Sequence, residues 1–516
     1  MQISKETLEK QPKTLEEAYQ IIQEQKQIIE QLQIDVAFQR EKEAALLEQI
    51  RLSKLRQFSP SSEKNIKQLN LFDEASIIFP EEGKEISVKE VKVNGYTRKE
   101  RPIRKALPKD LPREVIIHDI LEHEKLCECG SQLSQIGEEI TEQLKYIPAK
   151  TVVIQHKRLK YACKPCQETI KIAAMPVLFL PKSIATPELV AHTIVSKFCD
   201  HLPLYRQSTI WQRHAIDIPR SSLCTWLMKT APLCKPLVSL LQEAIVNNDY
   251  CRADETHIQV LKEPNRLDTS KSFMWVYLGG SLATPSVVFD YQQTRSGYHA
   301  QTFLNHFTGY LQTDAYSGYH FTQHIEAIMA LGCMAHARRP FAELAKASKK
   351  EGLAFEGLSY FEGLYGIEKY ARENHLTFEE RFQLRKEKAP PLLDNFKHWL
   401  LQNINKIPKQ HTLSKAMQYS LNHWNELTAY LKDGRLEIDN NAVENLIRPL
   451  ALGRKNFLFM GSPEGAKAAA LFYSLIATCK ANHIEPYQYF CAMLHKIRAC
   501  KTQEDYKKLL PYSIQF

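Results

Sequence analysis

The stretch Tyr250-Cys-Arg-Ala-Asp254-Glu-Thr-His-Ile-Gln-Val-Leu261 decides the fold class of this 516-residue chain. Apolar and polar side chains alternate along it, which predicts a half-buried strand with Asp254 at its middle. Residues 273–278 and 286–291 have the composition of two more strands. Gly279-Gly280 predicts the turn between those two strands, because glycine accepts the backbone angles of tight turns.

The segments that follow complete the pattern of an α/β sheet. A helix is predicted over residues 298–307, then a short strand over 309–314 that ends in Asp314, and then further α/β structure from residue 325. Three strands, a helix and a strand that ends in a carboxylate are the element order of a ribonuclease-H-like domain. In that order the first and fourth strands are neighbours, so we expect Asp254 and Asp314 to lie side by side.

Two neighbouring carboxylates predict a cation site. Mg²⁺ suits them, because it keeps several waters and takes one or two carboxylates together with substrate phosphate oxygens. A pair of such ions activates an attacking hydroxyl and stabilises the leaving oxygen in phosphoryl transfer. Either aspartate alone is an ordinary surface residue, so the prediction rests on their joint placement.

The next segment is predicted to interrupt the sheet with helices. Residues 339–434 are helical in pattern and rich in charged side chains. Breaks are expected at Pro390-Pro391 and at Pro408, because proline removes a helix hydrogen bond and clashes with the preceding turn. We interpret this segment as an inserted helical subdomain.

The chain after the insertion is expected to supply a third carboxylate. Asp439 or Asn440 is expected to cap a short helix that Pro449 ends. Glu444 and Arg448 follow Asn440 at four-residue spacing, so the three side chains share one helix face. Glu444 is therefore the predicted third carboxylate.

Two alternatives stay open for this segment. Glu437 is a competing acidic residue, although it lies before the cap, and Glu444 could instead be a surface glutamate paired with Arg448. Arg448, Arg454 and Lys455 are candidates to neutralise phosphates beside the site, since a guanidinium fork fits phosphate oxygens.

Upstream of the sheet, residues 181–245 are predicted to be helical and to bind DNA. Helices are expected at 189–198, 204–214 and 221–228, and Ser221 or Ser222 is expected to cap the last one. This is the outline of a helix-turn-helix, although any small helical subdomain has a similar pattern. The possible reading surface comprises Arg220, Ser221, Thr225 and Lys229.

Two close cysteine pairs predict a zinc module over residues 114–180. Cys127 and Cys129 form the first pair and Cys163 and Cys166 the second, and four thiolates can surround one tetrahedral Zn²⁺. The first spacing is C-x-C rather than the commoner C-x-x-C. A histidine, His123 or His156, could therefore replace one ligand, and four unliganded core cysteines are the alternative.

The same module is basic. No acidic residue occurs from residue 146 to 166, whereas Lys157, Arg158 and Lys160 follow one another closely. A one-signed run of this kind is suited to phosphate contacts, and a solvated charge run is the alternative. The polar linker before the module, residues 59–113, also ends in a basic arm.

The N-terminal residues 1–58 predict a coiled coil. Residues 14–57 hold no Gly or Pro, and apolar side chains recur at heptad spacing. A single helix of this composition cannot bury its stripe alone, so we expect a homo-oligomer that is at least a dimer, with packing on its own body as the alternative. The first heptad position holds Leu15, Ile22, Ile29, Val36 and Ile50, and the second holds Ala18, Leu32 and Leu46.

Composition limits the class of protein. With 44% hydrophobic and 25% charged residues the chain is an ordinary globular protein of several domains, and its net charge of +9 permits an anionic partner. We expect a cytoplasmic protein with reduced thiols, because no secretory signal or membrane span is recognisable and twelve cysteines form no disulfide framework.

The catalytic core is expected in two parts, residues 246–338 and 435–516, the second with C-terminal helices.

These residues carry a family resemblance over nearly the whole chain. The sequence resembles the insertion-sequence 66 family of bacterial DDE transposases, the large transposase subunit of the element. The matching stretches are residues 192–208, 253–256, 313–314, 335–339, 438–445, 448–456 and 461–462.

The resemblance implies a catalytic triad and a reaction. It implies that Asp254, Asp314 and Glu444 hold two Mg²⁺, that the module around the cysteine pairs binds zinc, and that DNA is the substrate. The implied activity is cleavage at the ends of an insertion element, followed by transfer of the freed 3′-hydroxyl ends to target DNA. Accessory proteins encoded by the same element and association with the bacterial nucleoid are further implications. Cys333-Met-Ala-His336 resembles a C-x-x-H signature that precedes the helical insertion in several DDE transposase groups.

Two rival functions remain at the level of sequence. One is a non-catalytic, zinc-containing DNA-binding regulator, in which the three carboxylates are dispensable. The other is a structure-specific nuclease on the same fold, which would cleave DNA without joining a 3′ end to a target.

Overall fold

The computed structural model describes residues 14–58, 91–93, 96–98, 151–157, 159–162, 170–172, 178–347 and 352–516. The four paired cysteines of the predicted zinc module, Cys127, Cys129, Cys163 and Cys166, lie outside these ranges, as does Arg158. The chain divides into two compact units, residues 1–78 with 177–516 and residues 79–176. None of the described helices has the length and apolar character that crossing a membrane requires.

The smaller unit contributes two short hairpins. β1 (Val91–Val93) pairs with β2 (Tyr96–Arg98), and β3 (Lys160–Ala162) pairs with β4 (Ile170–Ile172), both antiparallel. The second hairpin lies within the segment predicted to be a zinc module, and Lys157 just before it is exposed.

The N-terminal helix α1 runs unbroken over Leu15–Phe58. Its first heptad position is open to solvent within the chain: Leu15, Ile22, Ile29, Val36 and Ile50 are each at least 50% exposed. The predicted long helix is confirmed, and its apolar stripe is available for a partner.

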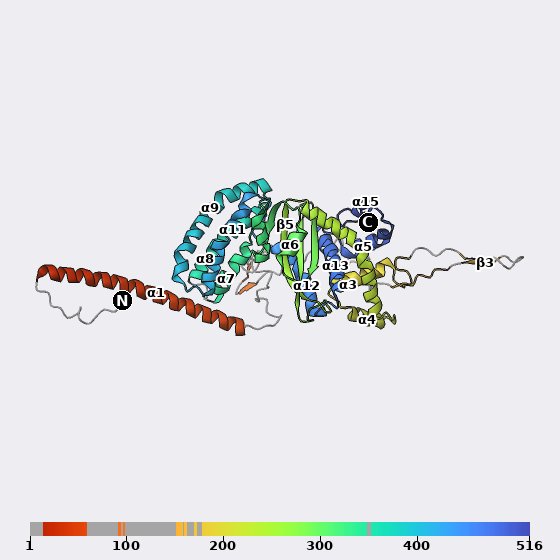
Figure 1. Cartoon of the computed structure of the whole chain (residues 1–516), viewed down its shortest axis with the longest axis horizontal. Coiled ribbons are helices and arrows are strands. Elements are labelled where there is room, and N and C mark those ends of the chain that lie inside the picture. Colours follow the sequence, from red (N-terminus) through yellow and green to blue (C-terminus); the bar gives the residue numbers. More distant parts are fainter. Residues whose placement is uncertain are drawn as a thin grey trace, which may run out of the picture. The chain divides into compact units, whose positions relative to one another are not determined.

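The larger unit is built on one mixed sheet of five strands in the order β7-β6-β5-β8-β9 (Figure 1). β7, β6 and β5 are antiparallel neighbours, whereas β5, β8 and β9 run parallel. The strands are β5 (Tyr250–Gln259), β6 (Lys271–Ser281), β7 (Thr284–Gln292), β8 (Gly309–Gln312) and β9 (Ile328–Leu331). The predicted strands over 250–261, 273–278, 286–291 and 309–314 are thus confirmed. The crossover between β7 and β8 contains the predicted helix, α6 (Gly297–Phe303).

The predicted turn between β6 and β7 was two residues too early. Gly279 and Gly280 lie inside β6, and the chain reverses between Ser281 and Thr284, whose hydroxyls are 2.7 Å apart. Gly280 adopts φ +83°, a conformation that suits glycine, and a Cβ there would approach the backbone of Thr284. The glycine therefore shapes the strand end rather than the turn.

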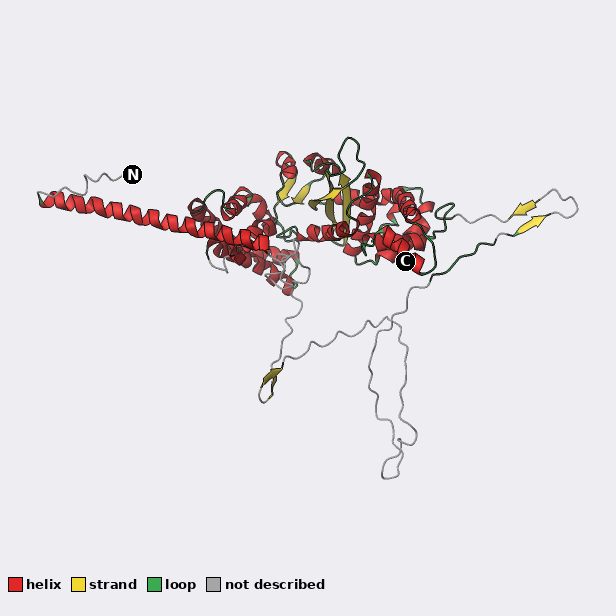
Figure 2. Cartoon of the chain, turned by 90° about the horizontal axis from the view of Figure 1, so that it is seen from below, coloured by secondary structure: helices red, strands yellow, loops and turns green. Residues whose placement is uncertain are grey.

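Helices enclose the sheet (Figure 2) and share one hydrophobic core with it. α5 packs against β6 and β7, and α13 packs against α5 and β7. α5 continues through Pro232 and Pro236, well past the predicted end, and Pro219 rather than a serine precedes its first turn. The helices are α3 (Pro187–Phe198), α4 (Leu204–Arg213), α5 (Arg220–Val246), α13 (Pro463–Ala481), α14 (Pro486–Lys496) and α15 (Gln503–Lys507).

Helix α13 also closes the outer edge of the sheet. The outward backbone N–H groups of Val287 and Phe289 on β7 donate to the hydroxyls of Thr478 (3.0 Å) and Ser474 (2.8 Å). The amide of Asn482 donates to the carbonyl of Pro285. Side chains of α13 and of Asn482 thus form hydrogen bonds with backbone groups of β7 that could otherwise pair with another strand.

The segment after β9 forms the predicted helical insertion with its own aromatic core. Phe341, Phe361, Phe396 and Trp399 contact one another there. Its helices gather on the side of the sheet opposite α5 and α13 (Figure 1). They are α7 (Met334–Ala347), α8 (Leu353–Glu373), α9 (Phe378–Asn403), α10 (Thr412–Asn422) and α11 (Trp424–Thr428), followed by the 3-10 turn η5 (Ala429–Lys432).

One predicted break in the insertion is wrong. α9 runs through Pro390-Pro391, although a proline inside a helix costs about 3 kcal/mol. Ala389, Leu393 and Phe396 are buried around this point, so tertiary packing outweighs the local penalty. Pro408 does interrupt the helices, since it lies between α9 and α10.

Candidate active site

Helix α12 carries Glu444 to the middle strand of the sheet. It spans Asn441–Phe457 and continues through Pro449, which was predicted to end it. Asn440 is its N-cap residue but does not cap it with its side chain. Instead the Asn440 amide donates to the carbonyl of Ala253 on β5 at 2.9 Å, which fixes the helix start next to Asp254. Glu444 lies one turn further along α12 and is 3% exposed.

The parallel pairing of β5 and β8 brings the two aspartates together. Arg252 on β5 is the register partner of Gln312 on β8, and Asp254 and Asp314 each lie two residues beyond this pair. One oxygen of Asp314 accepts the N–H of Tyr316 at 3.0 Å, and one oxygen of Asp254 accepts the N–H of Glu255 at 2.7 Å. The strand order therefore places the two aspartates on neighbouring strands at the same register, in line with our expectation.

The electrostatics show that the three carboxylates share one location. Burial raises the pKa of Asp254 well above its ordinary value, and the charges of Asp314, Glu255 and Glu444 raise it further. A carboxylate whose pKa is raised by neighbouring acidic groups is typical of functional sites, because a cation can neutralise the cluster. The structure thus brings together Asp254, Asp314 and Glu444.

A fourth acidic residue, Glu255, was not singled out from the sequence. It is buried, and its carboxylate accepts hydrogen bonds from Arg295 (2.7 Å) and from the hydroxyl of Tyr319 (2.8 Å). The guanidinium of Arg295 lies 3.6 Å from the ring centre of Tyr316. Burial and the charge of Asp314 raise the pKa of Glu255, while Arg295 opposes that shift. We interpret Glu255 as a residue that holds Arg295 and Tyr319 in place beside the carboxylate cluster.

The other side of Glu444 faces α7. Its Oε1 lies 3.5 Å from Nδ1 of His336, and its Oε2 lies 3.7 Å from the guanidinium of Arg339. Burial lowers the pKa of His336 to about 4, so the ring is neutral at neutral pH. Cys333 is fully buried, and its sulfur accepts the backbone N–H of Asn440 at 3.2 Å.

The competing residue Glu437 has a different role. The guanidinium of Arg381, from α9, donates to both of its oxygens, at 3.0 and 2.9 Å. Arg381 also pairs with the buried Glu368, which accepts from Arg385 as well. This network lowers the pKa of Glu437 and ties its segment to the insertion. The segment before α12 is therefore held in place by an ion pair with α9.

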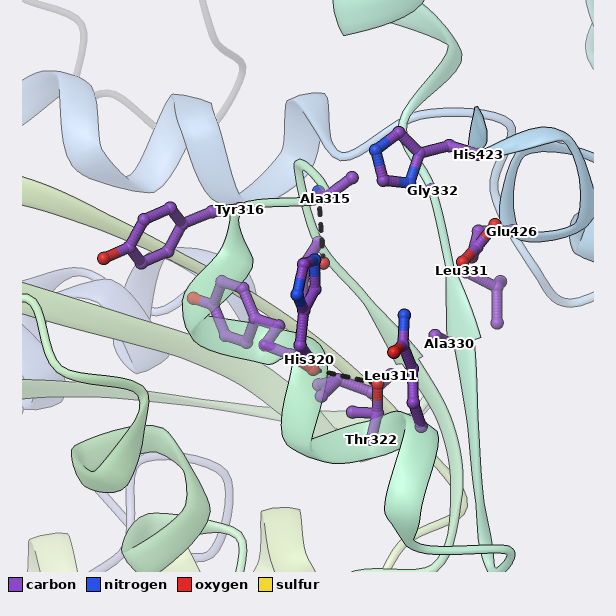
Figure 3. A pocket seen from close by; sticks show the side chains of 13 residues that line it. Leu311, Ala315, Tyr316, His320, Thr322, Ala330, Leu331, Gly332, His423 and Glu426 are labelled. Atoms are coloured by element: carbon purple, nitrogen blue, oxygen red, sulfur yellow. Dashed lines mark hydrogen bonds between the residues drawn. The ribbon is translucent and has the colours of Figure 1, made fainter. Parts of the chain in front are cut away.

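A small pocket opens beside the loop that follows β8 (Figure 3). Thr313 and Ala315, which flank Asp314, line it together with His320, His423 and Glu426. Ala315 has φ +63°, an unusual backbone conformation for a residue with a Cβ. The hydroxyl of Tyr419 donates to the carbonyl of Asp314 at 2.9 Å, so the insertion also braces this loop.

The predicted DNA-contacting residues lie at several places. Arg220 and Lys455 are exposed, Arg448 is half-buried, and Arg454 donates to the carbonyl of His257. A groove at the start of α5 is lined by Ser221, Thr225 and Lys229 of the predicted reading surface, and by Lys182. Lys160 lies in β3, and its side chain is outside the described residues.

Comparisons with known proteins identify the family. The model of the "Transposase IS66 family" matches residues 182–468, and that of the "zinc-finger binding domain of transposase IS66" matches residues 124–167. The "IS66 C-terminal element" matches residues 474–512, and "Transposase C of IS166 homeodomain" matches residues 45–116. The chain belongs to the IS66 family of transposases.

Several related proteins are similar to this chain over most of their length. Three uncharacterised proteins of Sinorhizobium fredii (strain NBRC 101917 / NGR234) are similar to most of the chain. The protein y4hP is 32% identical over 81% of this chain and 78% of its own length, and y4jD is 33% identical over 79% and 81%. The protein y4qI is 29% identical over 77% and 76%. The family supports a transposase, with DNA as partner and a structural zinc in the zinc-finger part.

Proposed function

We propose that the protein is a DDE transposase that cleaves at insertion-element ends and transfers the 3′-hydroxyl ends to target DNA. Asp254, Asp314 and Glu444 are its catalytic residues. The observation that carries the proposal is the convergence of three distant segments. Asp254 and Asp314 each lie two residues beyond one register pair of β5 and β8, and α12, which carries Glu444, packs against β5. A structural role gives no reason to gather acidic side chains in this way, whereas a metal-dependent reaction does.

The strand order supports a ribonuclease-H-like frame for this reaction. Three antiparallel strands are followed by two parallel ones in the order β7-β6-β5-β8-β9, with the first acidic residue on the central strand. The second acidic residue follows the adjacent parallel strand, and the third lies on a helix packed against β5. The proposed core comprises residues 246–338 and 435–516, with residues 339–434 as the insertion.

The chemistry of the donor set fits Mg²⁺. Carboxylate oxygens are the ligands this ion prefers, and two ions held by three carboxylates leave positions for DNA phosphate oxygens. When bound, the ions would activate the attacking group, water in cleavage and the 3′-hydroxyl in joining, and would stabilise the leaving oxygen of each in-line displacement. Asp254, Asp314 and Glu444 would hold them.

The protein's other residues orient the site and the DNA. Asn440 fixes α12 against β5, and Arg339 lies beside the outer oxygen of Glu444. Arg448, Arg454 and Lys455 of α12 are proposed to contact phosphates close to the triad. Arg220 and the basic run Lys157, Arg158 and Lys160 are proposed to bind DNA outside the reacting bond.

Further parts of the proposal concern assembly and zinc. Cys127, Cys129, Cys163 and Cys166 are the proposed ligands of the structural zinc. The exposed heptad stripe of α1 is proposed to form a coiled coil that makes the protein at least dimeric, as pairing of two element ends requires. Companion proteins of the same element are proposed partners.

The test is the loss of chemistry without loss of binding. Asp254→Asn, Asp314→Asn and Glu444→Gln should each lower cleavage and joining by about a thousandfold or more, because metal positioning and electrostatics supply most of the rate. DNA-end binding should survive in Asp254→Asn. The assay is a labelled element end with Mg²⁺ and a target plasmid, scored for nicking and for joined product.

Glu437→Gln is the matched control, since it removes a carboxylate from the same segment without touching the triad. It should remain active, and activity in Glu444→Gln but not in Glu437→Gln would move the third ligand seven residues back. Full activity in all three triad variants would refute the triad. A wild type that binds the element end but neither cleaves nor joins it would leave the DNA-binding regulator as the function. Cleavage without any joined product would favour the nuclease.

A further inference from the structure

A sulfur, an imidazole and a carboxylate meet at the start of α7. Among the described residues, Cys333, His336 and Glu444 form one group whose ligand atoms all lie within 4.8 Å of one another. The histidine Nδ1 and the glutamate Oε1 are 3.5 Å apart. Two ligand atoms bound tetrahedrally to one Zn²⁺ at about 2.0–2.2 Å lie about 3.3–3.6 Å apart, so this pair already has the required spacing.

The backbone holds the three groups in place. Cys333 and His336 are three residues apart around the first turn of α7, and so they point to the same side of it. The N–H of Met334 donates to the carbonyl of Ile438 at 3.1 Å, and the N–H of Asn440 donates to the sulfur of Cys333 at 3.2 Å. A backbone donor to sulfur is a common outer-shell contact of a metal-bound thiolate.

The two oxygens of Glu444 are directed at different partners. Oε1 faces His336, whereas Oε2 lies 3.7 Å from the Arg339 guanidinium. One oxygen can therefore bind an ion while the other keeps its arginine neighbour.

We propose that Cys333, His336 and Glu444 form a second metal site that takes a thiophilic divalent ion of the Zn²⁺ class. Thiolate and imidazole select such an ion over Mg²⁺, which prefers oxygen ligands. Three protein ligands leave the fourth tetrahedral position open to water or to a neighbouring group. This site uses none of the paired cysteines of the zinc-finger part.

The shared ligand gives the site a regulatory consequence, which rests on the proposed function. Glu444 is the proposed third carboxylate of the Mg²⁺ pair, and an ion held by Cys333 and His336 draws the same carboxylate to itself. Zn²⁺ therefore opposes the Mg²⁺-dependent reaction by withdrawing one catalytic ligand, while DNA binding continues.

The first experiment counts bound zinc and needs no activity. The full-length protein is dialysed against buffered free Zn²⁺, and zinc per chain is measured. The wild-type chain should hold one equivalent more than Cys333→Ser, because the zinc-finger part keeps its own ion in both. Cys224→Ser, which removes an exposed cysteine of α5, is the matched control and should equal wild type. Equal zinc in wild type and Cys333→Ser would overturn the site.

A second variant protects the test against misfolding. The side chain of His336 is 25% exposed, so His336→Gln disturbs packing less than a change at the buried cysteine. Co²⁺ added to wild type that carries one zinc per chain, in the zinc-finger part, should give a thiolate-to-cobalt absorption band that is absent in Cys333→Ser and weakened in His336→Gln. An unchanged band in both variants would assign the absorption to another cysteine and refute the proposal.

Inhibition separates this proposal from the proposed function. In the cleavage assay at fixed Mg²⁺, the zinc concentration for half-inhibition should rise at least about tenfold from wild type to His336→Gln. Equal zinc counts in wild type and Cys333→Ser, together with an active wild type and inactive triad variants, would remove the metal site and leave the transposase intact. A wild type that holds the extra zinc but does not cleave would keep the metal site and refute the proposed function.

Discussion

At Asp254, burial and the neighbouring charges act in the same direction, because both disfavour the ionised carboxylate. The residue lies on the central strand, and the charges of three nearby carboxylates disfavour its ionised form. Replacing it by asparagine removes this repulsion while keeping the shape of the side chain. The nearby acidic charges that make Asp254 a suitable metal ligand therefore destabilise the folded protein when no metal is bound.

We expect Asp254→Asn to stabilise the metal-free protein by about 1 kcal/mol, within the range of stabilising changes at functional sites. Denaturant unfolding with a chelator present measures the difference. Added Mg²⁺ should narrow it, because the ion binds folded wild type and not the variant. Asp394→Asn, at an exposed position of α9, should change stability by less than about 0.5 kcal/mol. A variant less stable than wild type without Mg²⁺ would contradict the repulsion argument.

Residue patterns predicted one side of the candidate site and not the other. Asp254 and Asp314 could be placed because alternation identifies strands and strand order sets their neighbours. The contact between His336 and Glu444 could not, because it joins segments 108 positions apart and depends on how α7 meets α12. Cys333-x-x-His336 was the available signal, yet its spacing alone does not reveal the third ligand.

At the scale of elements, prolines that lie inside helices gave the wrong prediction of where a helix ends. Helices α5, α9 and α12 all contain internal proline, and each continues through it. Local propensity favours a break at these positions, but the buried faces of the helices stabilise the continuous form. Strand predictions were less affected, since β5 alternates along most of its length and β6 contains a continuous apolar run.

The ion network between α8, α9 and the segment before α12 gives a pH-dependent contribution to stability. Arg381 lowers the pKa of Glu437, so the ion pair stabilises the fold above the unfolded-state pKa of about 4.3. That contribution is lost as the pH falls through the lower, folded-state pKa. The carboxylate of Glu437 is 36% exposed, so we expect about 1 kcal/mol at neutral pH, the upper limit for solvent-screened pairs.

Urea unfolding of wild type and Glu437→Gln between pH 3 and 7 checks this. The difference in free energy of unfolding should be constant above about pH 5 and should shrink on acidification. A difference that grows toward low pH would assign the opposite sign to the interaction. Glu379→Gln, an exposed change on α9, serves as the reference.

At the scale of the whole molecule, the long helix α1 differs from the helices around the sheet because it exposes a stripe of large apolar side chains. The apolar residues of its first heptad position are exposed, whereas many apolar residues of α5 and α13 are buried in the shared core. An isolated helix with an apolar stripe gains stability by pairing with a second copy.

Removing residues 1–57 should therefore lower the mass measured by light scattering, from a dimer or larger assembly to a smaller one, without unfolding the sheet. Thermal unfolding of the remaining chain checks the second point. An unchanged mass would mean that the stripe packs within one chain. A double change of Ile22 and Ile29 to lysine on one face should act in the same direction as the deletion.

The closure of β7 by α13 has a consequence for synthesis of the chain on the ribosome. Val287 and its partner Thr478 are separated by 191 positions. At about 5–20 residues per second, translation of that interval takes about 10–40 s. Throughout this time the nascent β7 presents bare backbone groups that invite pairing with neighbouring nascent chains on the same messenger. We therefore expect slow elongation between these two positions to lower the yield of native protein, and a chaperone that binds the emerging strand to restore it.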